Sequence, residues 1–244
     1  LYGFKVYTLV GGYKKYRNHV LSSFEYPFRF HVLGGYTGSG KTELLHALKQ
    51  QGSPVVDLEG IARHKGSAFG SIGMPEQPTQ EMFENLLSEA LLLQAGIKTD
   101  PPLQVPVWLE DESQRIGHVN LPGMIWKTMR QSPVFFLDIP FEERLKHITE
   151  EYGQLDRSKM IDAIGRIKEK LGGLNAKTAI QLLEEGNTLE SFRILLKYYD
   201  KYYWKGLHNR EGINSLLHTV DCKSVTAENA IPLLQYSGSK PEIH

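Results

Sequence analysis

FRFHVLGGYTGSGKTELLHALKQQ, residues 28–51, sets the architecture of the chain. A short apolar run is followed by a glycine-rich segment that ends in Gly40-Lys41-Thr42, and then by leucines at helical spacing. This order of strand, loop and helix is the context in which a Walker A sequence forms a phosphate-binding loop. We therefore predict a phosphate site at residues 35–42; the alternative is a chance match that binds nothing.

Each residue type in this loop has a physical role. Glycines allow backbone angles and a close approach that a side chain would block, so successive N–H groups can form an anion-binding nest. Lys41 brings a positive charge to the terminal phosphates, and the Thr42 hydroxyl can join a Mg²⁺ shell at the positive end of the helix dipole. The predicted cofactor-binding residues are Gly35, Tyr36, Thr37, Gly38, Ser39, Gly40, Lys41 and Thr42.

Two further apolar runs end in acidic residues. Residues 55–59, VVDLE, predict a second buried strand, and residues 105–112, VPVWLEDE, predict a third that resembles a Walker B element. Ligands in α/β sheets collect at the carboxyl ends of such strands. The candidate catalytic residues are therefore Lys41, Asp57, Glu110 and Asp111, with Glu59 as a further acid at the end of the second strand.

The roles of these acids stay open at the level of sequence. We predict a Mg²⁺ site formed by Thr42 with either Glu110 or Asp111, and the spacing does not separate the two. Asp57 also fits a helix N-cap, and the three acids at 110–112 also fit the start of a turn.

A cationic loop follows the second predicted strand. Residues 63–70, RHKGSAFG, place three basic-capable side chains before two glycines, which suits contact with a second phosphate or a nucleotide backbone; a solvated loop is the alternative. Arg115, just beyond the third strand, can clamp a phosphate bidentately. The predicted substrate-binding residues are Arg63, His64, Lys65, Gly66, Ser67 and Arg115.

Strands and helices alternate from residue 28 to 152. Helices are predicted at 79–95, at 124–130 and from 140, and a further buried strand at 133–139. This alternation is typical of an α/β protein with a P-loop NTPase-like, three-layer, mostly parallel sheet and an added helical region. The returning strand is predicted at 216–221 and a terminal helix at 226–234.

Three regions follow from this pattern. Residues 27–152 and 212–244 form the predicted α/β core, and residues 153–211 form the helical insertion, with helices at 158–171, 176–185 and 189–204. Residues 1–26 are interpreted as the tail of an upstream domain plus a linker, with a strand at 4–9 and a connector at 17–26.

The last helix of the insertion combines bases with aromatic residues. Arg193, Lys197, Lys201 and Lys205 are four apart, and tyrosines fill the neighbouring positions, a combination that grips phosphates and stacks unpaired bases. These four residues are the candidate nucleic-acid contacts. The alternative is a helix whose tyrosines pack inward while its lysines face water.

Composition adds weaker constraints. Lysine plus arginine equals aspartate plus glutamate at 28 each, so net charge identifies no partner, although residues 144–210 carry an excess of bases. One cysteine excludes an internal disulfide and fits a reducing compartment. With no apolar run of membrane-spanning length, we expect a cytoplasmic protein without a membrane partner.

Four segments together resemble the P-loop domain of tRNA 2-selenouridine synthases. They are GGYTGSGKTELL at 34–45, DLEGIARHKGSAFG at 57–70, PEQPTQEMFEN at 75–85 and WLEDESQRIG at 108–117, and the likeness covers essentially the whole chain. Family members carry an upstream rhodanese-like domain with a catalytic cysteine. Residues 2–17 are similar to its closing strand and turn, and the rest of that domain is absent from this chain.

The resemblance implies a transferase that replaces sulfur by selenium in 2-thiouridine at the wobble position of tRNA. It implies selenophosphate and geranyl diphosphate as substrates and an S-geranylated intermediate. Residues 35–42 would then grip the diphosphate, and residues 63–70 with Arg115 would line the same pocket. Whether ATP also binds stays open. The competing function is a small P-loop kinase that phosphorylates a metabolite with ATP.

Overall fold

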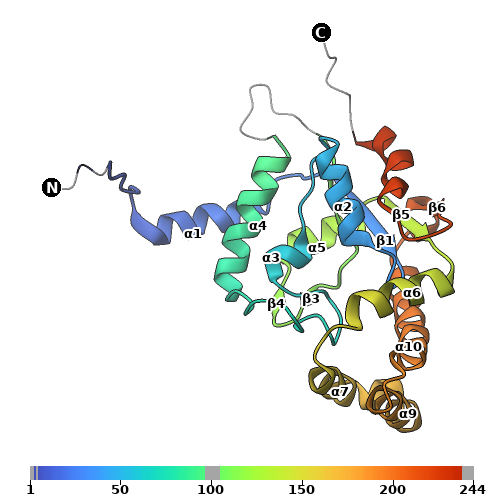
Figure 1. The fold of residues 1–244 in the computed structure, drawn as a ribbon. Helices are drawn as coiled ribbons and strands as arrows, with labels where there is room; N and C mark the ends of the chain where they lie inside the picture. The colour runs from blue at the N-terminus through green and yellow to red at the C-terminus, as the bar shows by residue number, and fades with distance from the viewer. Residues whose placement is uncertain (1–2, 4, 97–104, 238–244) are drawn as a thin grey trace.

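The computed structural model describes residues 3, 5–96 and 105–237, and its centre is a four-stranded parallel sheet (Figure 1). The strands are β1 (Phe30–Gly35), β2 (Val107–Glu110), β5 (Val134–Asp138) and β6 (Leu217–Asp221), in the spatial order β2-β1-β5-β6. All three pairings are parallel. The predicted α/β class with a P-loop NTPase-like sheet is confirmed, and the predicted strands at 28–33, 105–112, 133–139 and 216–221 are all present.

Helices cover both faces of this sheet because its strands are apolar on both sides. Along β5, Val134 and Phe136 pack with α4 (Gln80–Gln94) and α5 (Gly123–Arg130), whereas Phe135 and Leu137 pack with α2 (Lys41–Gln50) and the 3-10 helix η1 (Ala227–Tyr236). Successive side chains of a strand point to opposite faces, so one strand contributes to both layers. Helix α4 begins where predicted, with the Thr79 side chain accepting from the Met82 N–H.

The predicted strand at 55–59 is wrong. Only Val55 forms a β-bridge, to Trp108, and the chain then turns into the short helix α3 (Leu58–Ala62). Asp57 ends the extended segment because its carboxylate accepts from the Gly60 N–H at 2.6 Å, which is an N-cap bond. Asp57 and Glu59 therefore lie at the start of a helix.

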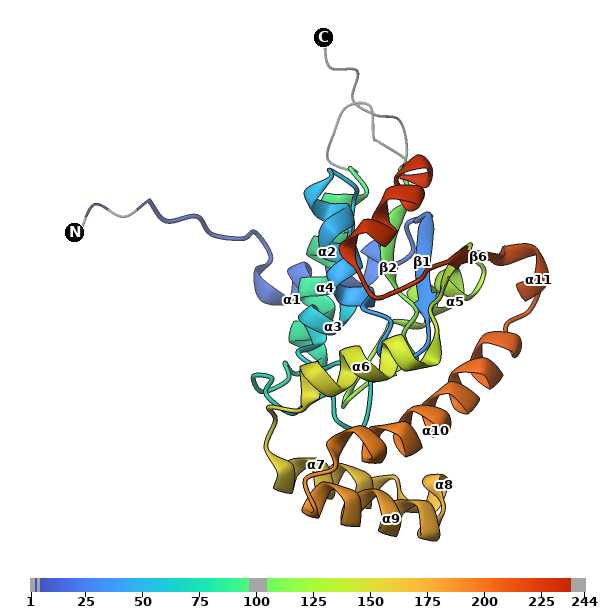
Figure 2. The same cartoon turned by 45° about the vertical axis from the view of Figure 1, so that its right-hand side comes forward.

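Apart from the N-terminal helix, the remaining elements of the described chain are β3 (Arg115–Ile116), β4 (Val119–Asn120), α6 (Phe141–Tyr152), α7 (Arg157–Arg166), α8 (Lys168–Leu171), α9 (Gly173–Glu184), the 21-residue α10 (Thr188–His208) and α11 (Ile213–Leu216). Helices α7, α9 and α10 share a hydrophobic cluster with α6 and with Phe69, separate from the two clusters on the sheet. Figure 2 shows α6 between the sheet and this helical group, with α10 running from the group back toward β6. Among the described helices, none is both long enough and apolar enough to cross a membrane.

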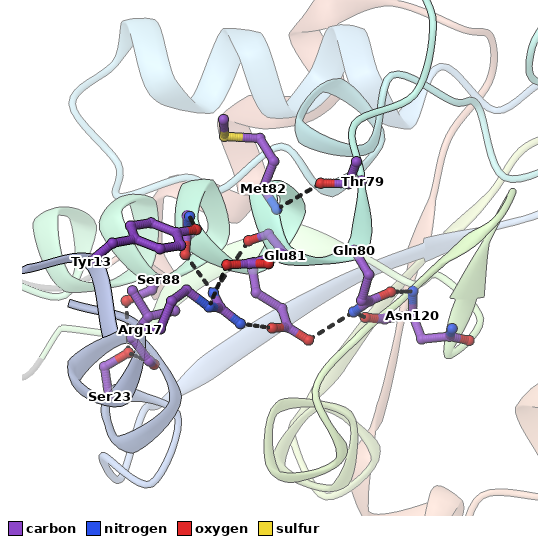
Figure 3. Close-up of polar contacts among 12 residues, drawn as sticks. Tyr13, Arg17, Ser23, Thr79, Gln80, Glu81, Met82, Ser88 and Asn120 are labelled. Carbon is purple, nitrogen blue, oxygen red and sulfur yellow. Dashed lines mark hydrogen bonds and ion pairs between the residues drawn. The ribbon is translucent and has the colours of Figure 1, made fainter. Parts of the chain in front are cut away.

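The N-terminal prediction is also wrong in part. The described residues before Gly11 form no strand, Phe4 lies outside the described residues, and the predicted connector is instead the helix α1 (Gly12–Ser23). This helix packs on α4 (Figure 3): Arg17 contacts Glu84 and Asn85, the Tyr13 hydroxyl accepts from Asn85 at 3.0 Å, and Ser23 pairs with Ser88 at 2.7 Å. Side-chain polar contacts therefore hold α1 against the core.

We expect Arg17→Met to release α1 from α4. The variant leaves the partly buried Glu84 carboxylate and the Asn85 amide without their cationic partner, a loss of about 1–3 kcal/mol for unsatisfied groups. Hydrogen–deuterium exchange should then rise within residues 12–23 and stay unchanged in β1. The control is Lys14→Ala, at an exposed residue of the same helix. Equal protection of α1 in both variants would contradict this role of Arg17.

Candidate functional site

The loop between β1 and α2 lies at the carboxyl edge of the sheet, where the Gly35 amide donates to the Tyr203 hydroxyl and the Ser39 amide donates to the Tyr36 carbonyl. Gly38 has φ +80°, and a Cβ there would lie 2.7 Å from the Arg144 carbonyl oxygen, so both angle and space require glycine. The first amide bonded within the helix is that of Leu44, to the Gly40 carbonyl, which leaves the preceding amides of α2 available. Lys41 Nζ donates to the Gly35 carbonyl at 3.0 Å, across the loop.

This loop forms one wall of a cavity of about 390 Å³. The other walls come from five separate parts of the chain, namely helix α3, the loops at 65–67 and 111–113, helix α6 and helix α10. Among the described residues the lining is Gly35, Thr37, Gly38, Ser39, Gly40, Lys41, Thr42, Glu43, Glu59, Lys65, Gly66, Ser67, Asp111, Glu112, Ser113, His147, Ile148, Glu151, Tyr152, Tyr199, Tyr202 and Tyr203. The cavity thus has a floor formed by the glycine-rich loop with Lys41 and Thr42, and a wall of tyrosine rings.

Two carboxyl groups face Thr42 in this cavity. Thr42 Oγ1 donates to Glu59 Oε2 at 3.1 Å, and Glu112 lines the same cavity close enough to Glu59 for the two carboxyl groups to affect each other's pKa. Burial is the main cause that raises the pKa of each, and the Glu59 charge raises the pKa of Glu112 further. A Cβ on Gly66, where φ is +63°, would lie 2.6 Å from the Glu112 carboxylate oxygens, so the glycine lets the loop pass against this pair. Burial therefore favours the protonated form of both carboxyl groups.

The two acids preferred from sequence occupy different positions. Glu110 is fully buried outside the cavity lining, where Oε2 accepts from the Leu58 N–H at 2.9 Å, and burial raises its pKa well above the usual range. Asp111 does line the cavity, but its carboxylate is bound by Arg210 and by the Tyr203 hydroxyl. Thr42 contacts Glu59 instead of either acid predicted with it. Sequence reasoning missed Glu112 as a site residue because three consecutive acids carry no signal of which one faces the loop.

The remaining predicted site residues divide into two groups. Lys65, Gly66 and Ser67 line the cavity, with the Lys65 ammonium group bound by Glu151 of α6. Four others lie outside the lining: Tyr36 packs edge-on against Phe136, Arg63 donates to the Glu76 carbonyl, His64 is buried beside Gly70, and the exposed Arg115 donates to the Gly117 carbonyl. The N-cap Asp57 is outside it as well.

Helix α10 supplies a wall of the cavity that sequence reasoning did not place. Tyr199, Tyr202 and Tyr203 line it, and the Tyr203 hydroxyl accepts from the Gly35 amide at 3.1 Å and donates to Asp111 at 2.8 Å. Burial, followed by the Asp111 charge, raises the pKa of Tyr203 well above its usual value, so the phenol stays protonated. The sequence analysis placed these tyrosines only beside the basic residues of the helix, because the residue pattern alone does not say which face meets the loop.

The four basic residues predicted to contact nucleic acid have different surroundings on α10. Arg193 is held in ion pairs by Glu142 and Glu190. Lys197 and Lys201 line a second cavity of about 360 Å³, and Lys205 is exposed outside it.

The metal prediction can be compared with the side chains present. Within the described part of the chain, no group of three or more His, Cys, Asp or Glu residues could hold a metal ion. Mg²⁺, however, commonly binds through one or two carboxylates and the substrate's phosphates. Thr42 with Glu59 fits that pattern. Cys222 is buried outside the cavity, and burial raises its pKa to about 11, which keeps the thiol protonated.

Comparison with known proteins identifies the family. Residues 28–227 match the sequence model of the family described as the tRNA 2-selenouridine synthase AAA domain. The chain belongs to this family. Proteins named tRNA 2-selenouridine synthase from Bdellovibrio bacteriovorus and Hydrogenovibrio crunogenus are 33% and 35% identical over 83% and 82% of the chain. The chain spans 62% and 61% of the length of these two relatives.

We expect Glu110→Gln to flatten the dependence of stability on pH. Burial raises the pKa of Glu110 above its unfolded value, so at pH values between the two the folded state binds more protons and stability falls as pH rises. For one such group the slope is about 1.4 kcal/mol per pH unit, from the unfolded pKa of about 4.3 up to the raised folded pKa. Gln keeps an acceptor for the Leu58 N–H but cannot ionise, so this slope should disappear.

Urea unfolding of the chain at pH 5, 6.5 and 8 measures this effect. The control Glu89→Gln, at an exposed carboxylate of α4, should keep the wild-type slope. A Glu110→Gln slope equal to that of wild type would show that Glu110 is ionised in the folded protein.

Proposed function

We propose that this chain is the P-loop part of an enzyme that replaces sulfur by selenium in 2-thiouridine at the wobble position of tRNA. Membership of the tRNA 2-selenouridine synthase family over residues 28–227 supports this activity. In this proposal geranyl diphosphate occupies the main cavity, the S-geranylated base forms beside it, and selenophosphate supplies selenium. Because the chain spans about three-fifths of its relatives, a rhodanese-like domain is proposed as an upstream partner in the complete protein.

The observation that carries the diphosphate assignment is the two-sided cavity. Its floor offers glycine-loop amides, Lys41 and Thr42, which suit a diphosphate. Its opposite wall offers the rings of Tyr152, Tyr199 and Tyr202, and a volume of about 390 Å³ lies in the range of small-molecule sites. An apolar chain on a diphosphate satisfies both walls, which favours a prenyl diphosphate over a free phosphate.

The acidic residues Glu59 and Glu112 have further roles within this proposal. Thr42 and Glu59 would hold a Mg²⁺ ion, which would neutralise charge on the diphosphate leaving group. The raised pKa values of Glu59 and Glu112 favour their protonated forms, which lessens the repulsion that two free carboxylates would exert on an anionic ligand. Lys41 Nζ can replace its hydrogen bond to the Gly35 carbonyl with one to a phosphate oxygen of the ligand.

We expect Lys41→Ala to weaken binding of geranyl diphosphate by roughly 10- to 150-fold. The lost interaction is a hydrogen bond from a charged donor, worth about 1.5–3 kcal/mol. Isothermal titration calorimetry of the chain with Mg²⁺ measures this change. The control is Lys49→Ala, an exposed lysine in the last turn of the same helix, which should bind as wild type does.

Two comparison ligands make this experiment decisive. Inorganic pyrophosphate should bind more weakly than geranyl diphosphate, because it leaves the aromatic wall uncovered. ATP tests the kinase alternative. Unchanged affinity for geranyl diphosphate in Lys41→Ala would overturn the assignment of the loop, and tight ATP binding with no affinity for geranyl diphosphate would favour the kinase.

A further inference from the structure

The second cavity lies between helices α8 to α9 and helix α10. It has a volume of about 360 Å³, and six of its lining residues are polar or aromatic: Lys170, Asn175, Lys197, Tyr198, Lys201 and Tyr202. Three lysines and two tyrosines thus converge from two helical segments that are separate in sequence. In Figure 2 these segments lie side by side at the end of the molecule away from α1.

The two tyrosines present ring surface to this cavity. Their centroids are 4.7 Å apart with planes at 51°, and Tyr202 is 45% exposed. Exposed aromatic rings in a concave site leave apolar surface in contact with water, which is unfavourable unless a flat ligand covers the rings. A nucleic-acid base is such a ligand, since every base has a π-face that stacks on an aromatic side chain.

The three lysines are exposed and available for an anion. Within the described residues, no carboxylate lies in ion-pair distance of Lys170, Lys197 or Lys201. Arg193, one turn before Lys197 on α10, shows the contrast because Glu142 and Glu190 neutralise it. An acidic peptide would satisfy the lysines, but only a nucleic acid alternates anionic phosphates with flat bases in the way that this cavity alternates lysines with rings.

The second cavity is also tied to the first. Tyr202 lines both of them. Helix α10 is fixed relative to the phosphate loop by the neighbouring Asp200, which binds the buried Arg144, and by Tyr203, which binds the Gly35 amide. A base on Tyr202 therefore sits next to whatever occupies the main cavity, at a distance that the fold sets in advance.

We propose that the second cavity binds an unpaired base of the RNA substrate adjacent to the nucleotide being modified. The base stacks on Tyr198 and Tyr202, and Lys170, Lys197 and Lys201 contact the flanking phosphates. This inference rests on the proposed function, because it takes the substrate to be RNA. It assigns to the α8–α10 group the task of holding a single-stranded loop so that its modified base reaches the phosphate loop.

The test uses the 244-residue chain and an anticodon stem-loop RNA with 2-thiouridine at the wobble position and 2-aminopurine at a neighbouring loop position. We expect Tyr198→Ala and Tyr202→Ala each to weaken RNA binding roughly 5- to 150-fold, the range measured for loss of one base–aromatic stack. Both should also remove the quenching of 2-aminopurine fluorescence that stacking causes. Tyr198→Phe and Tyr202→Phe keep the ring and should retain affinity and quenching.

Matched controls separate stacking from general effects on α10. Trp204→Ala removes a 52%-exposed ring of the same helix outside both cavities, and it should bind RNA as wild type does. Lys201→Ala should reduce the slope of log affinity against log salt concentration by about one, which corresponds to one lost phosphate contact. Lys177→Ala, at an exposed lysine of α9, should leave this slope unchanged.

The outcomes distinguish this site from the proposed function as a whole. Wild-type RNA affinity and quenching in Tyr198→Ala and Tyr202→Ala would overturn the stacking site and leave the function standing. No binding of the stem-loop by the wild-type chain would overturn both. Tyr198 lines only the second cavity, so Tyr198→Ala should bind geranyl diphosphate normally; a loss there would show that the variant disturbs the fold, and Tyr198→Phe then decides the case by its quenching.

Discussion

The arrangement of the two cavities depends on the buried guanidinium group of Arg144. Its side chain is 3% exposed and donates to the Ile139 carbonyl, the Thr37 carbonyl and both carboxylate oxygens of Asp200. A buried charge is costly unless it is paired and hydrogen-bonded, and the planar fork of arginine fits several fixed acceptors at once. The phosphate loop, the start of α6 and the middle of α10 therefore have to adopt one mutual position.

A second buried ion pair holds α10 near its carboxyl end. Arg210 binds Asp111, and Asp111 also accepts from Tyr203, whose hydroxyl accepts from the Gly35 amide. Replacing such pairs by apolar residues often leaves stability unchanged, so their value is better described as positional than as net stabilising energy. They place an acid and a tyrosine against the first amide of the loop. As a result Tyr203 connects the aromatic wall of the cavity directly to its floor.

Local patterns predicted the parts of the fold that depend on short-range order. Apolar runs identified β1, β5 and β6, and the cap at Thr79 identified the start of α4. The strand predicted at residues 55–59 was wrong because a short apolar run before an acid fits both a strand end and a capped helix. The hydrogen bond from the Gly60 N–H to Asp57 favours the helix. Helix α1 was missed since only Val20 and Ser23 of it are buried, too few to give a helical period.

The site was predicted to the extent that it is contiguous in sequence. Residues of the glycine loop line the cavity together with Lys65, Gly66 and Ser67, whereas the acid pair, Asp111's partner Arg210 and the tyrosines of α10 come together only through the tertiary fold. Charge balance shows why the missing part matters. Glu151 neutralises Lys65 and Arg210 neutralises Asp111, so Lys41 faces Glu59 and Glu112. Burial favours the protonated forms of these two carboxyl groups, which lessens the negative charge beside Lys41. Because Glu43 adds a further carboxylate to the lining, the proposed diphosphate would depend on the oriented amides of the loop and on any bound cation more than on net attraction.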